Sequence, residues 1–321
     1  MTKIPVRRSI GSAYGFAFAN LATILGLIWL PLAILLCGEY FAISRYLDAV
    51  LTALANGNRF AIYTGVGYLY LYRFAALFLE AMIAVPIMRQ SLGLRTKGAF
   101  VHFALGADEL RMFGAFVAFF LVVLTIEIVG VVVWLAFAAG STAAARMLGT
   151  VDGISALVIA GWSTIILAAC LIGALLYVYV RLGFFLVAVT VAEKRIDLGR
   201  SWILTQDNFW RVFCVFVSVT LPVWLLYLAL QMEFSGFAAF QDASNFVPFA
   251  NQFASSSRVA AIQVHAILNW LPYLFGAWFL IQPLSLGLAA GAAAAAYRTL
   301  VPEPAAVSTL LADGPLAAAT S

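Results

Sequence analysis

Six long apolar runs constrain the fold of this 321-residue chain more than any other feature of its sequence. A helix needs about 20 apolar residues to cross about 30 Å of hydrocarbon, because in lipid each backbone amide must be satisfied within its own segment. The runs meet that length and lack the alternating pattern of membrane strands. They predict an all-α, polytopic membrane bundle of about six transmembrane helices. The predicted spans are residues 13–37, 61–88, 112–139, 156–180, 212–232 and 271–296.

The charge composition excludes the soluble alternatives. Lys, Arg, Asp and Glu make up 10% of the residues, whereas a soluble domain carries about 25%. So few charges cannot cover the surface of one or two soluble domains, and they fit neither an intrinsically disordered chain nor a nucleic-acid module. We therefore expect an integral membrane protein whose partners are membrane lipids, with no nucleic acid among them.

The first run follows three basic residues, as a secretory signal would. A cleaved signal has an apolar stretch of about 7–15 residues and a small-residue cleavage site, whereas this run continues to residue 37 without one. We expect an uncleaved first span, within a single transmembrane domain over residues 1–298. The Pro- and Ala-rich residues 299–321 are expected to form a flexible cytoplasmic tail.

Lys and Arg are distributed unevenly between the connections. The N-terminus, residues 89–111, residues 181–211 and the tail carry thirteen of the 18, and the alternate connections carry four. By the positive-inside rule, the basic connections and both termini face the cytoplasm.

Two of the basic connections resemble each other at an offset of about 100 residues. Residues 109–116 align with residues 209–216 and share one Arg and two Phe, and each stretch leads into a span. The second and third spans run in the same directions as the fourth and fifth. Two parallel repeats are therefore a candidate architecture.

The same connections mix aromatic and basic residues, a mixture typical of amphipathic helices at headgroup depth. These residues either anchor the helix ends as an aromatic belt or contact lipid headgroups, with anionic phospholipids as the candidate partners. The candidate headgroup contacts are Arg95, Lys97, Arg200, Trp202, Trp210 and Arg211.

Three ionisable residues, Arg73, Glu80 and Glu127, lie inside the predicted spans. Such groups are costly in hydrocarbon and are functional candidates for that reason. Two arrangements of Arg73 are open: it snorkels to the outer surface through neighbouring tyrosines, or it pairs with Glu127 at a similar depth. Glu80, two turns from Arg73, completes a polar cluster or is protonated.

Segments beside the spans carry further patterns. Residues 39–54 have a helical apolar stripe and are expected on the membrane surface or as a cap on the bundle. Residues 233–270 repeat Phe every three or four positions, which indicates a lid over a cavity or, as we favour, a membrane-dipping helix. Gly287 and Gly291 form a small-residue face for close packing within the bundle or in a dimer.

Catalytic and metal-binding signatures are missing from the sequence. It contains no phosphate-binding loop, no nucleophile elbow and no paired zinc histidines. The odd number of cysteines has no zinc or disulfide spacing, and Cys37, Cys170 and Cys214 are expected to be buried thiols. We expect no enzyme activity, no cofactor and no metal, and the sequence leaves the oligomeric state open.

One stretch of about 30 residues carries a family resemblance. Ala192-Glu193-Lys194-Arg195, then Ser201-Trp202-x-Leu204-Thr205, then Phe209-Trp210-Arg211 entering a span, resembles the uncharacterised YciC-like bacterial membrane proteins. It is similar, too, to the membrane domain attached to some glycerophosphodiester phosphodiesterases. The resemblance implies a helical protein of the bacterial inner membrane. The chain has no room for the soluble phosphodiesterase domain, so no catalytic residue carries over.

These observations predict a non-catalytic envelope or lipid-associated protein of the inner membrane. The alternative is a small-solute transporter with Arg73, Glu80 and Glu127 lining its path. A water-accessible route past the two carboxylates favours transport, whereas grooves that open sideways to lipid favour lipid association.

Overall fold

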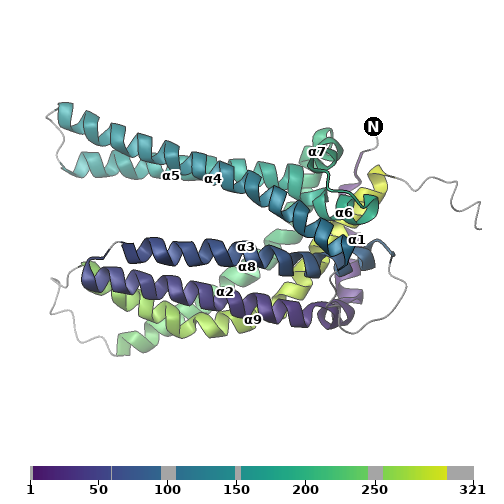
Figure 1. Cartoon of the computed structure of the whole chain (residues 1–321), viewed down its shortest axis with the longest axis horizontal. Helices are drawn as coiled ribbons and strands as arrows, with labels where there is room; N and C mark the ends of the chain where they lie inside the picture. The colour runs from purple at the N-terminus through teal and green to yellow at the C-terminus, as the bar shows by residue number, and fades with distance from the viewer. Residues whose placement is uncertain (1–2, 59, 95–105, 149–152, 245–255, 302–321) are drawn as a thin grey trace, which may run out of the picture.

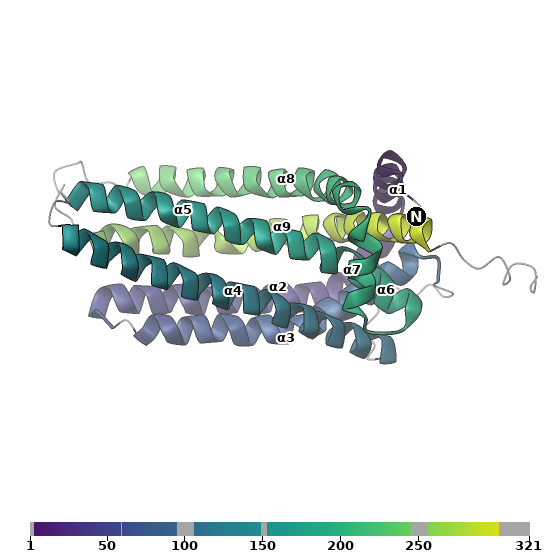
Figure 2. The same ribbon diagram turned by 90° about the horizontal axis from the view of Figure 1, so that it is seen from above.

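The chain folds into a bundle of long helices. The structure, a computed structural model, describes residues 3–58, 60–94, 106–148, 153–244 and 256–301. Within these ranges there is no strand, and six segments are long and apolar enough to cross a membrane. The predicted all-α polytopic bundle is confirmed. Its long helices, which run side by side in Figures 1 and 2, are α2 (Leu21–Asn56), α3 (Phe60–Ser91), α4 (Ala107–Leu148), α5 (Gly153–Val178), α8 (Phe209–Ser244) and α9 (Ser256–Leu300).

The shorter elements gather at one end of the bundle (Figure 1). A π-helical turn, η1, continues α5 into α6. The N-terminal helix α1 and the short helix α7, which connects α6 to α8, lie at the same end. Their bounds are α1 (Val6–Ala19), η1 (Tyr179–Gly183), α6 (Phe184–Glu193) and α7 (Leu198–Gln206). We call this the basic end, because the basic N-terminus and the connection between α5 and α8 lie there, and we call the opposite end the distal end. That the basic end faces the cytoplasm stays a prediction.

The first apolar run is divided, which corrects the predicted span 13–37. The helix breaks at Asn20, whose backbone leaves the helical region and whose side-chain amide donates to the Phe16 carbonyl at 2.9 Å. The preceding helix, α1, lies across the direction of the long helices (Figure 2). It buries the small residues Ala13 and Ala17, so its apolar character serves packing. The membrane-crossing helix is therefore α2.

The glycine motif of α9 is the surface on which α1 packs. A Cβ on Gly291 would lie 3.0 Å from the Ala13 Cα, and one on Gly287 would lie 3.3 Å from the Ala17 Cβ and 2.9 Å from the Ile24 Cδ1. Only glycine lets these backbones approach so closely. The predicted use of this motif within the bundle is confirmed.

The segments expected to be separate outer elements are extensions of the long helices. Residues 39–54 continue α2 to Asn56, so they form neither a surface helix nor a cap. Most of residues 233–270 extend α8 and begin α9, and residues 245–255 fall outside the described ranges. Because α2 has 36 residues, it is about 54 Å long at 1.5 Å per residue and exceeds the hydrocarbon layer.

The hairpin of α4 and α5 diverges from the rest of the bundle toward the distal end (Figure 1). None of the most apolar stretch of α4 is buried by protein, whereas half of the corresponding stretch is buried in α3 and in α9. Near the basic end, α4 packs on α3 and α6. The hairpin is therefore attached at one end only, which leaves space beside α4.

The three cysteines contradict the expectation of buried thiols. Cys37, Cys170 and Cys214 are free, and each is exposed on the surface of the protein. Each lies within an apolar helix, so its outward side is the one that lipid covers. Apolar sequence around a cysteine does not distinguish lipid exposure from burial in protein.

Candidate functional site

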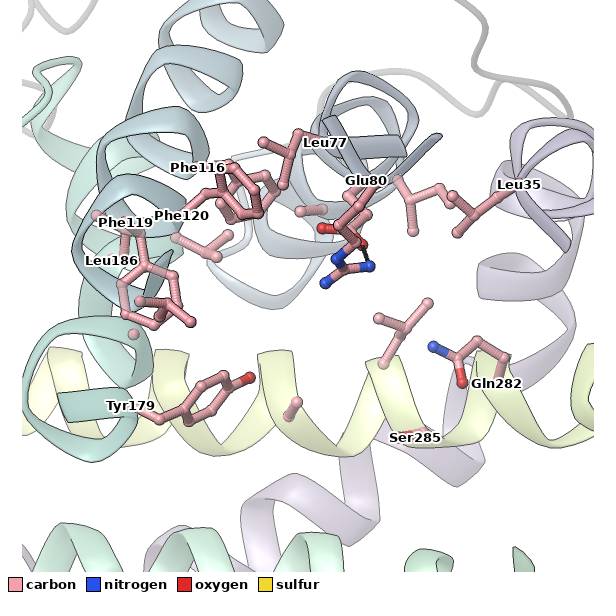
Figure 3. A pocket seen from close by; sticks show the side chains of 18 of the residues that line it. Leu35, Leu77, Glu80, Phe116, Phe119, Phe120, Tyr179, Leu186, Gln282 and Ser285 are labelled. Atoms are coloured by element: carbon pink, nitrogen blue, oxygen red, sulfur yellow. Dashed lines mark hydrogen bonds and ion pairs between the residues drawn. The ribbon is translucent and has the colours of Figure 1, made fainter. Parts of the chain in front are cut away.

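A cavity of about 1100 Å³ lies between α4 and the other helices (Figure 3). Residues of α2, α3, α4, η1, α6, α8 and α9 line it. Along α3 the lining extends from Val66 to Met88, which is about 33 Å at 1.5 Å per residue. That length matches the hydrocarbon thickness of about 30 Å. We call this space the membrane cavity.

The lining of the membrane cavity changes from apolar to polar along its length. Toward the basic end it is aliphatic and aromatic, with Leu32, Ile87, Met88, Phe116, Phe184, Leu186, Val187 and Phe216. Polar groups begin about halfway along and continue toward the distal end, with Glu39, Tyr70, Tyr72, Arg73, Glu80, Glu127, Gln282 and Ser285. Tyr179 packs on Phe216, where the apolar part gives way to the polar part. Figure 3 shows Gln282 and Ser285 on the opposite wall from Glu80, with the Tyr179 hydroxyl directed into the space between them. The cavity is amphipathic.

An ion pair lies inside the cavity. Arg73 and Glu80 are two turns apart on α3, and the Arg73 Nη1 is 2.7 Å from the Glu80 Oε1. Counted from Arg89, at the basic end of α3, they lie about 24 Å and about 14 Å along the helix. Both depths fall within the hydrocarbon layer. The pair supplies each charge with a counterion where water is scarce.

Glu127 lines the same cavity, on α4. The sequence left open a pair between Arg73 and Glu127, but in the described part of the chain the partner of Arg73 is Glu80. The three residues singled out from the sequence therefore share one cavity, with the ion pair made along a single helix.

Glu39 belongs to the cavity, although the sequence placed it outside the membrane. Because α2 starts at Leu21 rather than at residue 13, the crossing segment is shifted toward the C-terminus. Glu39 then lies about 27 Å from Leu21, at a depth similar to that of Arg73. Asn20, the one side-chain amide within the first apolar run, is the sequence feature that could have predicted the later start of the span and so the position of Glu39.

Three of the four candidate headgroup residues that the structure describes have partners that hold protein segments together. Arg200 contacts Glu193 at 3.1 Å, Arg211 donates to the Ile4 carbonyl at 2.9 Å, and the ring of Trp202 packs on Arg181. Trp210 is 73% exposed and free to meet lipid. Arg95 and Lys97 lie outside the described residues.

Arg181 is a residue that the sequence reasoning did not single out. It sits in the π turn η1, and its guanidinium lies 5.0–5.4 Å from the ring centres of Tyr177, Trp202 and Phe209. Its backbone carbonyl accepts a hydrogen bond from the Thr205 hydroxyl at 3.2 Å. Arg181 thus holds α7 against the junction of α5 and α6.

A carboxylate network closes the basic end. The Glu193 carboxylate forms ion pairs with the Arg195 Nη2 at 2.6 Å and the Arg200 Nε at 3.1 Å. It also accepts a hydrogen bond from the Tyr297 hydroxyl at 3.1 Å. Asp108, at the start of α4, pairs with both Arg89 and Arg111. These contacts join α6, α7 and α9, and α3 to α4, so the charges there are engaged in holding the helices together.

The described residues contain no group of three or more His, Cys, Asp or Glu side chains placed to hold a metal ion. The membrane cavity has charged groups and hydroxyls toward the distal end and an apolar lining toward the basic end. Neither the family models nor the known proteins nor the solved structures compared with this chain match it.

Proposed function

We propose that the chain is a non-catalytic, lipid-associated protein of the bacterial inner membrane, which holds one amphiphilic molecule in the membrane cavity. The observation that carries the proposal is the amphipathic lining. Apolar side chains cover the part near the basic end, where an alkyl chain fits, and polar side chains cover the part toward the distal end, where a headgroup fits.

The attachment of the α4 and α5 hairpin supports access from lipid. The hairpin packs on the bundle near the basic end, and its apolar stretches stay uncovered by protein farther along. An amphiphile reaches the cavity from the surrounding lipid without crossing water, which keeps its alkyl chain in an apolar medium throughout.

The alternative, a transporter of a small hydrophilic solute, has weaker support. Arg73, Glu80 and Glu127 do line one cavity, as that alternative requires. Between Glu80 and the basic end, however, the part of α3 that lines the cavity consists of Ile83, Ala84, Ile87 and Met88. A hydrophilic solute would lose its hydration there and gain no polar partner. The apolar half favours an alkyl chain.

Native mass spectrometry of the protein purified in mild detergent tests the proposal. Ala289 lines the cavity and is exposed to it, so Ala289→Trp fills part of the space without displacing a buried side chain. We expect the wild-type chain to retain one amphiphile per copy and Ala289→Trp to retain at least tenfold less.

Leu280→Trp is the matched control. Leu280 lies on the same helix, is 72% exposed and does not line the cavity, so this variant should retain as much amphiphile as the wild type. Equal retention by Ala289→Trp, or a wild-type chain that carries no amphiphile, would contradict the proposal. A retained hydrophilic metabolite would favour the transporter.

A further inference from the structure

The membrane cavity carries more negative than positive charge. Three carboxylates, those of Glu39, Glu80 and Glu127, line it together with one guanidinium, that of Arg73. The ion pair at 2.7 Å matches Glu80 with Arg73. Two carboxylates are therefore left over in a space within the hydrocarbon layer.

In the described part of the structure no hydrogen bond or close ion pair involves the side chain of Glu39 or of Glu127, and Arg73, which also attracts Glu39, is paired with Glu80. Glu39 lies about 27 Å from the start of α2, and Glu127 lies about 24 Å from Arg111 along α4. They thus lie on two different helices that line the cavity, each well within the length that crosses the hydrocarbon layer. Unpaired charges at such a depth are expensive and mark sites of function.

A third, independent feature is an unused acceptor. The Oε1 atom of Gln282 is buried and accepts no hydrogen bond in the described part of the structure. Gln282 lines the cavity on the wall opposite Glu80 (Figure 3). A buried acceptor without a donor destabilises the protein unless a ligand or water supplies the donor.

Aromatic rings surround the same polar region. Tyr70 and Tyr72 line the cavity from α3 next to Arg73, and Tyr46 lines it from α2 about 10 Å beyond Glu39. The faces of aromatic rings attract ammonium groups, and carboxylates do so more strongly. Acidic groups and ring faces favour a cation, and an ammonium group also carries N–H donors for the carboxylates.

From this lining we infer that the membrane cavity selects an amphiphile with an ammonium headgroup, attracted by the carboxylates of Glu39 and Glu127. The inference rests on the proposed function, which supplies the alkyl-binding half of the cavity. An anionic headgroup would be repelled by these two carboxylates. The cavity therefore favours a cationic headgroup, whereas the basic residues of the connections favour an anionic one.

Three probes with the same alkyl chain test this selectivity: dodecylammonium, its neutral acetylated form N-dodecylacetamide, and the anion dodecanoate. Binding to the full-length protein in uncharged detergent is followed by native mass spectrometry. We expect dodecylammonium to bind at least tenfold more tightly than either other probe. The comparison uses the wild-type chain, so it does not depend on the folding of a variant.

The variant Glu39→Gln with Glu127→Gln should lose this preference at least tenfold and should still bind the neutral probe. Asp48→Asn is the matched control, because Asp48 is exposed on α2 and does not line the cavity. If the wild type bound the neutral or anionic probe as tightly as dodecylammonium, the ammonium assignment would be overturned and the proposed function would stand. If none of the three bound, the proposed function would fail as well.

Discussion

Arg73 lies at a depth where an unpaired charge is unfavourable, and its partner is on its own helix. Spacing of seven residues places Glu80 on the same face two turns away, so the pair forms without help from another helix. The side chain of Arg73 is 54% exposed and that of Glu80 is 28% exposed, so both still face the open cavity. The pair stabilises α3 in the membrane and leaves its charges available to a ligand.

Double-mutant stability measurements test this pair. Arg73→Gln and Glu80→Gln should each lower the free energy of unfolding, and the double variant should lose about 1 kcal/mol less than the sum of the two, because the second change removes a charge that is already unpaired. Thermal unfolding in detergent, followed by tryptophan fluorescence, gives the comparison.

The matched control for the coupling is Glu127→Gln. Its effect should add to that of Arg73→Gln, since the two side chains form no ion pair in the described structure. Additive losses for Arg73 and Glu80, together with coupling between Arg73 and Glu127, would show that the pair is formed between helices instead.

Arg211 and Asn208 act on the N-terminal segment. The backbone N–H of Ile4 donates to the Asn208 Oδ1 at 3.2 Å, and the Ile4 carbonyl accepts from Arg211 at 2.9 Å. Ile4 is fully buried, and so is the bond from its N–H, whereas the bond from the exposed Arg211 is partly buried. The guanidinium thus holds the chain before α1 onto the start of α8.

Arg211→Ala should release this segment and reduce stability by about 1.5–3 kcal/mol, the usual effect of losing a hydrogen bond to a charged group. Limited proteolysis of an N-terminally tagged protein would show faster cleavage before α1. Trp210→Ala, at an exposed neighbour, should leave the cleavage rate unchanged. Equal cleavage in Arg211→Ala and wild type would refute the role.

At the scale of elements, the contact of α1 with α9 depends on small residues on both helices. Ala13 and Ala17 meet Gly291 and Gly287, and the backbones approach too closely for larger side chains. The contact fixes α1 at the basic end, where it packs on α9 and α8. The apolar residues of α1 are therefore used against protein rather than in a span.

Gly291→Val should lower the midpoint of thermal unfolding, because the added side chain overpacks the contact with Ala13 at a cost of about 1–3 kcal/mol. Gly276→Val on the same helix is the control, since a Cβ at Gly276 meets no atom within 4 Å. Equal losses in the two variants would mean that α1 does not depend on the glycine face.

At the scale of the whole molecule, the basic connections lie together at one end, as their charge predicts. Cysteine accessibility in a variant without Cys37, Cys170 and Cys214 tests which compartment they face. Asn56→Cys, exposed at the distal end, should react with an impermeant thiol reagent added to spheroplasts. Asp207→Cys, exposed between α7 and α8, should react only after permeabilisation. Labelling of both from the same side would contradict the proposed topology.

The sequence by itself determined the class of the protein and the number of its spans. Whether a segment can cross a membrane depends on its length and local hydrophobicity, so the six runs were enough to predict six spans. Gly287 and Gly291 were predictable on the same ground, since their spacing places both on one face of a helix.

The tertiary structure decided what a residue meets. Whether α1 packs as a separate helix, whether Cys170 faces lipid or protein, and whether Arg73 pairs with Glu80 or with Glu127 depend on how each helix is turned toward its neighbours. The sequence does not determine the rotation of each helix about its axis, because an apolar face packs equally well against lipid or another helix. The membrane cavity, and the position of Glu39 in its lining, depend on how distant segments pack together, which only the tertiary structure defines.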